Sequence, residues 1–434
     1  MSGAAYVGPV PKHWKVRPLR LLGRLLKGTG ASKEDIVEFG VPCIRYGDLY
    51  TTHNNFIERA RTHLTPERAL DYTPIEYGDV LFAASGETIE EIGKSAVNLL
   101  RGARCGGDLV IFRPTEPTVP RFLGYATDAA PVAAQKSLAG RGTTVKHIYP
   151  DELREVVIAV PPIHEQQAIA DFLDRETARL DALVAAKQRV LALLAEKRKA
   201  IISTAVTRGL DPKAKLRDSG IPWLGEIPAH WEVTPLRYLV SFLSGGTPDK
   251  SNSDYWTNGT IPWVSPKDMK VDAIDDSEDH ITEDAVDGSA TRFVPVGSVL
   301  VVVRGMILAH TLPVAVTTGP VTINQDIKAL VCVDRILPDF LRAVLAGHSK
   351  VILSLADTSA HGTKKLETEI LQRFELPVPS LPEQRSIVEH LARATANLQA
   401  MSAATESTIA LLKERRSALI AAAVTGQLDV EAAK

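Results

Sequence analysis

The 434-residue chain has little cysteine, no long apolar run and almost no net charge. Cys43, Cys105 and Cys332 lie far apart and form no Cys-x-x-Cys pair, which argues against a disulfide framework or a zinc site, so we expect buried thiols. No stretch of eighteen apolar residues occurs, and the first residues lack the apolar run of a secretion signal. The cytoplasm is therefore the expected location.

A net charge of -2 gives no overall sign of nucleic-acid binding, which usually shows as a basic domain or stripe. DNA binding by this chain would need local basic groups, or a partner that supplies much of the affinity. Hydrophobic residues make up 45% and charged residues 24%, which is the balance of a folded globular protein. At this length, two or three domains are expected.

Motifs for catalysis are also missing. Gly93-Lys94-Ser95 has Thr88 where a phosphate-binding loop needs its first glycine. No Asn-Pro-Pro-Tyr, His-Glu-x-x-His or Gly-x-Ser-x-Gly motif occurs. Asp326-Ile327-Lys328 could come from a nuclease core, but its counterpart Asp108-Leu109-Val110 lacks the lysine, so we interpret it as strand structure. We therefore expect no catalytic residue, no metal site and no cofactor.

What the chain does contain is an internal duplication. PKHWKVRPLR from Pro11 recurs as PAHWEVTPLR from Pro228, and PPIHEQQAIADFL from Pro161 recurs as PSLPEQRSIVEHL from Pro379. LLAEKRKAIISTAVTRGLD from Leu193 recurs as LLKERRSALIAAAVTGQLD from Leu411. With three weaker matches, six segments repeat in the same order at offsets of 217 to 220. Chance does not produce such a series, and a repeat of this kind defines the architecture.

Each half begins with a mixed α/β (α+β) domain and ends in a long helix. Short β-rich runs between Gly/Pro turns predict strands at 80–84, 109–112, 299–303 and 327–333. The helical parts are rich in Ala, Leu, Glu, Lys and Arg, which favour helix. The expected order is a mixed domain at 1–155, a helix at 160–208, a linker at 209–222, a second mixed domain at 223–375 and a second helix at 379–427.

Both helices carry an apolar residue at nearly every seventh position. Leu173, Leu180, Lys187, Leu194 and Ile201 follow this spacing in the first copy, with Ile169, Leu183, Val190 and Leu191 expected beside them; the second copy has Leu391, Leu398, Thr405, Leu412 and Leu419. Such a seam must be covered by another helix. We expect the two helices to pack as an antiparallel coiled coil, with packing on each helix's own domain as the alternative.

The quoted segments, with PWLGEIPAHWEV from Pro222, resemble the specificity subunit of type I restriction-modification systems over essentially the whole chain. One departure is YVGPVPKHW near the amino terminus, where the second copy has the fuller WLGEIPAHW. The resemblance implies a non-catalytic protein that reads a bipartite site in double-stranded DNA, one half-site per domain. It implies methyltransferase (modification) and restriction/translocase subunits as partners, with the chemistry in those partners.

Loops that differ between the two halves are the candidates for reading bases, because Arg and Lys suit guanine or phosphate and neighbouring glycines let the backbone approach closely. Residues 45–48 face 265–268, residues 85–87 face 304–306, and residues 141–146 face 361–365. The predicted DNA-contacting residues are Arg45, Tyr46, Ser85, Arg141, Lys146, Lys267, Arg304, Lys364 and Lys365.

The basic helix tails at 196–199 and 414–416 alternate with glutamate, so we assign them to subunit docking rather than to DNA. Two other classes of function stay open at this point. One is a self-sufficient nuclease or methyltransferase, which would need a catalytic motif. The other is a coiled-coil adaptor that binds only proteins, which the near-neutral charge allows.

Overall fold

A computed structural model describes residues 7–30, 35–86, 88–89, 91–142, 145–358 and 363–430 of the chain. The chain divides into two compact units: unit 1 comprises residues 1–188 and 406–434, and unit 2 comprises residues 189–405. Each unit therefore contains one mixed domain and one half of each long helix.

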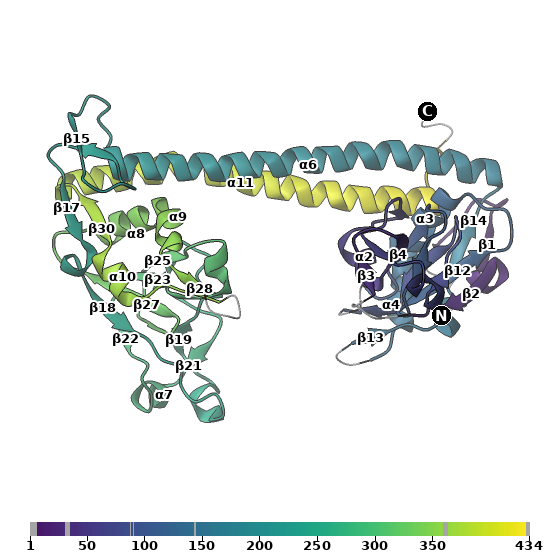
Figure 1. Ribbon diagram of the computed structural model, residues 1–434, viewed down its shortest axis with the longest axis horizontal. Helices are drawn as coiled ribbons and strands as arrows, with labels where there is room; N and C mark the ends of the chain where they lie inside the picture. Colours follow the sequence, from purple (N-terminus) through teal and green to yellow (C-terminus); the bar gives the residue numbers. More distant parts are fainter. Residues whose placement is uncertain are drawn as a thin grey trace. The chain divides into compact units, whose positions relative to one another are not determined.

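Two main sheets form the mixed domain of unit 1 (Figure 1). The first has the order β2 (Gly23–Lys27), β12 (Leu109–Pro114), β8 (Val80–Ala83), β10 (Ser95–Asn98) and β5 (Phe56–Ile57). The second has the order β3 (Ile36–Val37), β6 (Thr62–Leu64), β4 (Val41–Ile44), β11 (Arg104–Cys105) and β7 (Thr73–Pro74). Smaller sheets pair β1 (Lys15–Pro18) with β14 (Val157–Val160) and β9 (Ser85–Gly86) with β13 (Lys146–His147). The helices are α2 (Tyr46–Thr51), α3 (Pro120–Asp128), α4 (Ala130–Ala139) and α5 (Pro150–Leu153), with 3-10 turns η1 (Leu19–Leu21) and η2 (Arg68–Asp71).

Unit 2 repeats this plan. Its first sheet has the order β18 (Val240–Ser244), β27 (Ile327–Cys332), β23 (Val299–Val302), β25 (Val314–Thr317) and β20 (Ala273–Ile274). The second has β21 (His280–Ile281), β19 (Ile261–Val264), β26 (Val321–Ile323) and β22 (Phe293–Val294). Smaller sheets are β17 (Glu232–Pro235) with β30 (Glu375–Val378), β15 (Leu216–Asp218) with β16 (Glu226–Pro228), and β24 (Arg304–Gly305), β29 (Lys364–Lys365) and β28 (Asp357–Thr358). The helices are α7 (Glu283–Asp287), α8 (Pro338–Gly347), α9 (Ser349–Ser354) and α10 (Thr368–Arg373), with 3-10 turns η3 (Leu236–Tyr238), η4 (Ser253–Tyr255) and η5 (Met306–Ala309).

The equivalent strands lie at equivalent places in the two units, which confirms the duplication. β8 and β23 are each the middle strand of their sheet, and all four residues of each are buried. Leu81 of β8 faces Ile111, and Leu300 of β23 faces Ala329 in the neighbouring strand. A continuous apolar run suits a strand covered on both faces, which is why these segments could be predicted as strands from sequence.

The long helices are α6 (Ile163–Arg208) and α11 (Leu381–Val424). In unit 1 the beginning of α6 shares a core with the end of α11, through residues that include Ile169 and Ile420. In unit 2 the end of α6 shares a core with the beginning of α11, through residues that include Ile202 and Ile387. The expected antiparallel pairing is therefore confirmed.

The seven-residue seam is buried at Leu173, Leu180 and Leu194, and in α11 at Leu391, Leu398 and Thr405. The side positions were predicted incorrectly in part: Leu183 is 44% exposed and Val190 is 38% exposed. The other two were predicted correctly, because Ile169 is buried and Leu191 is half-buried. Val184, which was not predicted, is half-buried; Val184 and Leu191 lie four positions after Leu180 and Lys187. An α-helix has 3.6 residues per turn, so the fourth residue lies closer to the line of contact here than the third.

A carboxylate at the start of each long helix binds the repeated His-Trp pair. Glu165 accepts a hydrogen bond from Nε1 of Trp14 at 2.9 Å and lies 2.8 Å from Nε2 of His13. In unit 2, Glu383 accepts from Nε1 of Trp231 at 2.9 Å, and His230 lies 3.1 Å away. Each glutamate therefore connects the start of its long helix to the His-Trp pair that precedes β1 or β17.

The glutamine that follows each of these glutamates is a second joint. Gln166 accepts a hydrogen bond from the backbone N–H of Val119 at 3.0 Å, and buried Gln384 accepts one from Leu337 at 2.8 Å. Val119 and Leu337 precede α3 and α8, so the glutamines satisfy N–H groups at the start of those helices. The repeated EQ motif is thus explained by how each domain is attached to its long helix.

Three further expectations concern the cysteines, the linker and the membrane. Cys43 and Cys105 are buried as expected, whereas Cys332 is only half-buried; burial raises the pKa of each thiol to about 12. The expected linker contains β15, which pairs with β16 as a hairpin. Within the described part of the chain, no helix is long and apolar enough to cross a membrane.

Candidate nucleic-acid interface

The β9-β13 sheet of unit 1 gathers three of the predicted DNA-contacting residues. Lys146 lies opposite Gly86, and His147 lies opposite Ser85 and is 3.1 Å from its hydroxyl through Nδ1. Arg141 forms a backbone bridge with His147. Ser85, Arg141 and Lys146, which come from segments about sixty residues apart in the sequence, are thus neighbours on one small sheet.

The start of α2 lies against the same sheet. Arg45 is the residue that precedes α2, and Tyr46, 40% exposed, is its first residue. Tyr50, one turn further along, donates a hydrogen bond from its hydroxyl to the carbonyl oxygen of Ser85 at 3.0 Å. The structure therefore brings together all three of the loops that were predicted to read DNA in the first half.

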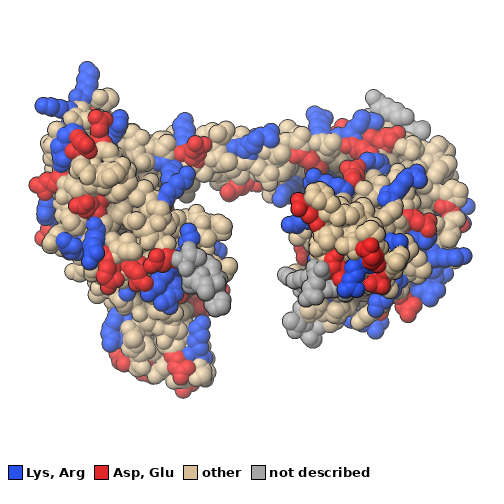
Figure 2. Space-filling model, viewed as in Figure 1, with Lys and Arg blue, Asp and Glu red and all other residues tan. Residues whose placement is uncertain are grey.

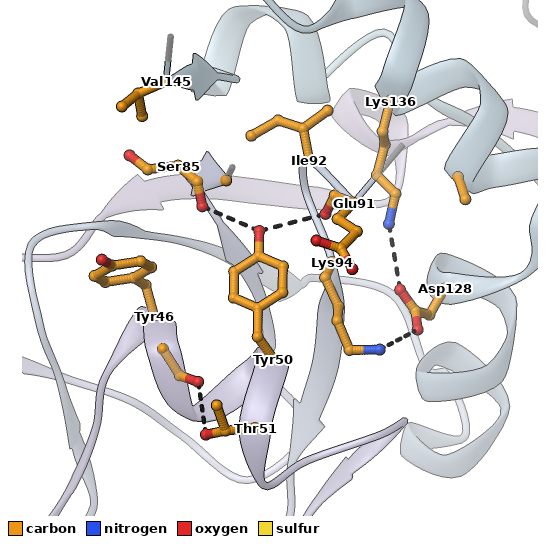
Figure 3. A pocket seen from close by; sticks show the side chains of 13 residues that line it. Tyr46, Tyr50, Thr51, Ser85, Glu91, Ile92, Lys94, Asp128, Lys136 and Val145 are labelled. Atoms are coloured by element: carbon orange, nitrogen blue, oxygen red, sulfur yellow. Dashed lines mark hydrogen bonds and ion pairs between the residues drawn. The ribbon is translucent and has the colours of Figure 1, made fainter. Parts of the chain in front are cut away.

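Between α2 and β9 lies a cavity of about 710 Å³ (Figure 3). Tyr46 and Ser85 line it, as does Val145. The sequence analysis did not predict the other polar residues of its wall as site residues; they are Tyr50, Thr51, Glu91, Lys94, Asp128 and Lys136. Lys94 was considered only in an incomplete phosphate-loop motif, and the others lie in no motif, because these residues come from separate segments that meet only in the folded domain.

Two lysines share one carboxylate at the back of this cavity. Asp128, at the end of α3, lies 3.5 Å from the ammonium of Lys94 and 3.6 Å from that of Lys136. Lys136 is only 1% exposed and donates a hydrogen bond to the carbonyl of Thr127 at 2.9 Å. Burial lowers the pKa of Lys136 to about 8, although Asp128 opposes the shift. Burial, with a smaller effect of Glu91, raises the pKa of Tyr50 to about 12.

The buried ammonium makes stability depend on pH in a predictable direction. Between pH 8 and the ordinary lysine pKa, the folded chain has lost the Lys136 proton while the unfolded chain still holds it, so stability rises with pH. Relative to a Lys136→Met variant, the wild type should gain roughly 2 kcal/mol in free energy of unfolding between about pH 7.5 and 9.5. Denaturant titrations of both proteins at the two pH values measure this. Parallel pH profiles would contradict the assignment.

In unit 2 the small sheet of β24, β28 and β29 gathers three predicted residues in the same way. Arg304 lies opposite Lys365, and Gly305 lies opposite Lys364. Arg304 is 51% exposed, and its nearest carboxylate is that of Asp326, 3.9 Å away. Lys365 forms a 2.7 Å ion pair with Glu367. The strand pair thus presents three cations on adjacent residues.

Lys267 differs from the others because it is already paired. Its ammonium lies 3.0 Å from Asp279 and 3.2 Å from Glu278, and the hydrogen bond to Asp279 is the main cause of its raised pKa. In unit 1, Arg141 pairs with Glu152 and Lys146 donates to the carbonyl of Gly142. By contrast, Arg45 and Lys364 form no ion pair with any described residue. These two cations can bind a phosphate or a base without first breaking an ion pair with a carboxylate.

Parts of the predicted loops, namely Glu87, Thr143, Thr144, His361 and Gly362, lie outside the described residues. In each helix tail assigned to subunit docking, one arginine forms an ion pair within the chain: Arg198 pairs with Asp272, and Arg416 pairs with Asp181 at 3.1 Å. Both acidic partners lie in the same unit as the arginine, and the alternation with glutamate did not predict these pairs.

Among the residues with described positions, no cluster of three His, Cys, Asp or Glu could hold a metal ion.

Charges of both signs are interspersed on the visible face of each unit, as Figure 2 shows. This agrees with the net charge of -2. On this face the cations are therefore dispersed among acidic side chains and do not form a broad basic surface.

Comparison with known proteins identifies the family of both copies of the repeat. The family described as the type I restriction modification DNA specificity domain matches twice, at residues 11–192 and 228–409. The chain belongs to this family. The two matches start 217 residues apart, so each copy of the repeat is one family domain together with much of its long helix.

Two relatives carry the name of a specificity subunit. The chain is 41% identical over 167 residues to the type I restriction enzyme EcoR124I/EcoR124II specificity subunit of Escherichia coli. The matched segment covers 38% of this chain and 40% of that protein. The chain is 31% identical over 169 residues to the type I restriction enzyme MjaIX specificity subunit of Methanocaldococcus jannaschii, covering 38% of each. The chain thus matches well under two thirds of the length of either relative.

The fold has a counterpart over almost the whole chain. A solved chain described under "Structural basis underlying complex assembly and conformational transition of the type I R-M system" covers 97% of this chain and is itself covered completely, with a TM-score of 0.65 and 21% identity. This likeness establishes a shared fold.

Proposed function

We propose that the chain is the DNA sequence-recognition subunit of a type I restriction-modification complex, active in the cytoplasm. Each mixed domain, 1–155 and 223–375, reads one half of a bipartite site in double-stranded DNA. The helices at 160–208 and 379–427 set the distance between the half-sites, with 209–222 as the linker between the two copies. The chain itself catalyses no reaction and needs no cofactor.

The observation that carries this proposal is the pair of equivalent loop clusters. The same scaffold position, β9-β13 in unit 1 and β24-β29 in unit 2, presents Ser85 and Lys146 in one copy and Arg304 and Lys364 in the other. Two domains that recognise different half-sites need different side chains on a similar scaffold, because base edges differ in their hydrogen-bond donors and acceptors.

The family membership and the names of the relatives support the partner assignment. We propose modification methyltransferase subunits and restriction/translocase subunits as partners, and these subunits supply the chemistry. The family match favours neither a self-sufficient nuclease or methyltransferase nor an adaptor that binds only proteins.

The test measures DNA affinity with and without the partner. The chain alone should bind DNA weakly, because its net charge of -2 gives little drive from counterion release. Adding the proposed methyltransferase partner should strengthen site-specific binding by at least about a hundredfold. Titration of labelled duplexes at fixed salt measures both states. Nanomolar, site-specific binding by the chain alone would contradict the partner requirement.

A matched pair of variants tests the loop assignment in the same complex. Arg304→Ser places the serine of the first copy in the second and should weaken binding to the specific site about tenfold or more. Arg335→Ser is the control, because Arg335 is similarly exposed but pairs with Glu232 at the edge strand β17. Equal losses in the two variants would count against a base-reading role for the β24-β29 cluster.

A further inference from the structure

Unit 2 contains a basic cavity where the end of α6 meets α9 and the segment around Trp223. Its volume is about 340 Å³. Three cations line it, Lys199, Arg208 and Lys350, together with the hydroxyl-bearing residues Ser203, Thr204 and Thr207. The remaining lining residues are Trp223, Leu224, Gly347, His348 and Val351, so the wall contains no carboxylate.

The charges in this wall are largely uncompensated. Lys199 donates to the hydroxyl of Ser349 at 3.4 Å, and Arg208 forms a loose ion pair with Glu226 at 3.5 Å. Over the described ranges, neither Lys199 nor Lys350 forms an ion pair. Partial burial, and then the charge of Lys350, lower the pKa of Lys199. The ammonium groups of Lys199 and Lys350 repel each other, and no carboxylate offsets this repulsion. An anion bound between them would do so.

A buried histidine adds to this wall. His348 is 5% exposed, its Nε2 lies 3.2 Å from the hydroxyl of Thr207, and its Nδ1 has no hydrogen-bond partner. The ring stands edge-on to that of Trp223, with centroids 4.9 Å apart. Burial, and then the charge of Lys199, lower the pKa of His348 to about 4, so the ring is neutral near pH 7. The positive charge of the cavity thus comes from its lysines and arginine.

The other copy of the repeat provides an internal comparison. In unit 1 the equivalent residues, near the end of α11 and the start of α4, line two cavities. One has a volume of about 10 Å³ and an apolar wall apart from one threonine: Val7, Ala126, Ala129, Pro131, Val132, Ile158, Ala159, Val424 and Thr425. The other, of about 340 Å³, is lined by Ser417 with Lys94, Lys413 and Arg416, but also by the carboxylates of Asp128 and Asp181. Ala129 stands where unit 2 has His348, before α4 and α9 respectively, and Ser417 occupies the repeat position of Lys199. In unit 1, Lys94 and Arg416 are paired with Asp128 and Asp181, so cations in a wall without a carboxylate distinguish the cavity of unit 2.

We propose that this cavity of unit 2 binds a phosphate-type oxyanion. The ammonium groups of Lys199 and Lys350 and the guanidinium of Arg208 would neutralise the anion, and the hydroxyls of α6 would donate to its oxygens. The anion is either inorganic phosphate or a phosphate group of nucleic acid, since both present the same oxygens. This inference does not rest on the proposed DNA-reading role of the loops, which lie on other elements.

The experiment titrates the full-length chain with inorganic phosphate by calorimetry, at constant ionic strength set with chloride. The wild type should bind phosphate saturably. Lys199→Ser, which installs the residue of the other copy, should weaken binding about tenfold or more, because a hydrogen bond to a charged group is lost. Lys213→Ser makes the same charge change at an exposed position outside the helix tails assigned to subunit docking and should leave the affinity within about twofold.

A second arm identifies the source of the phosphate. If the anion is a nucleic-acid phosphate, Lys199→Ser also weakens DNA binding by the complex with its methyltransferase and lowers the salt slope by about one, while Lys213→Ser does not. If the anion is free phosphate, DNA affinity is the same in all three proteins. Equal losses in both variants overturn the proposal, as does the absence of saturable phosphate binding together with unchanged DNA affinity.

Discussion

Lengthening both long helices by one heptad is expected to lengthen the gap in the recognised DNA site. Seven residues inserted after Lys187 and seven after Thr405 add ~10 Å to each helix and keep the apolar seam in register. At 3.4 Å per base pair this corresponds to roughly three base pairs. The structure supports these insertion points, because the division between the two units falls at 188/189 in α6 and at 405/406 in α11.

The new gap also rotates one half-site around the duplex by more than about a quarter turn, so binding should weaken even where the longer gap is accepted. Mapping methylated bases in cells that carry the variant measures the result. A longer gap with unchanged half-sites is expected, and efficient methylation at the original gap would contradict the ruler function. As a comparison, deleting two residues from each helix rotates the seam by about 200° and should abolish assembly.

Replacing residues 1–150 with the matching domain of a relative should change one half of the target completely and leave the other half intact. The reason is that each loop cluster lies within one unit, with Ser85 and Lys146 in unit 1 and Arg304 and Lys364 in unit 2. Base-resolution mapping of methylation before and after the exchange measures both half-sites at once. A change in both half-sites would refute the assignment of one domain to one half-site.

The structure adds a condition to this exchange. The replaced segment contacts the retained helices through Trp14, which donates to Glu165, and through Tyr125, whose hydroxyl donates to Asp174 at 2.8 Å. A donor domain that keeps residues of these types should assemble. The same exchanged protein with Trp14→Ala should have a free energy of unfolding lower by about 3 kcal/mol or more. The substitution removes an aromatic side chain from a core and leaves Glu165 without its hydrogen-bond donor. That pair separates failure to fold from failure to read DNA.

The sequence by itself determined the duplication, the order of domains and helices, the antiparallel helix pair and the resemblance to a family of specificity subunits. These features are written in local patterns: a repeat at a constant offset, continuous apolar runs in β8 and β23, and an apolar residue at nearly every seventh position of α6 and α11. Such patterns predict structure because the period of the apolar residues dictates which face an element buries.

Only the tertiary structure decided which side chains meet. Lys94, Asp128 and Lys136 come from separate elements and form one buried cluster, while Lys267 looked available in the sequence but is paired with Asp279. Lys199 and Lys350 of unit 2 form no ion pair with any described residue, whereas in unit 1 Arg416, next to the repeat position of Lys199, is paired with Asp181. Charge pairing and burial depend on distances of a few ångströms between residues far apart in the chain, and neither composition nor periodicity encodes those distances.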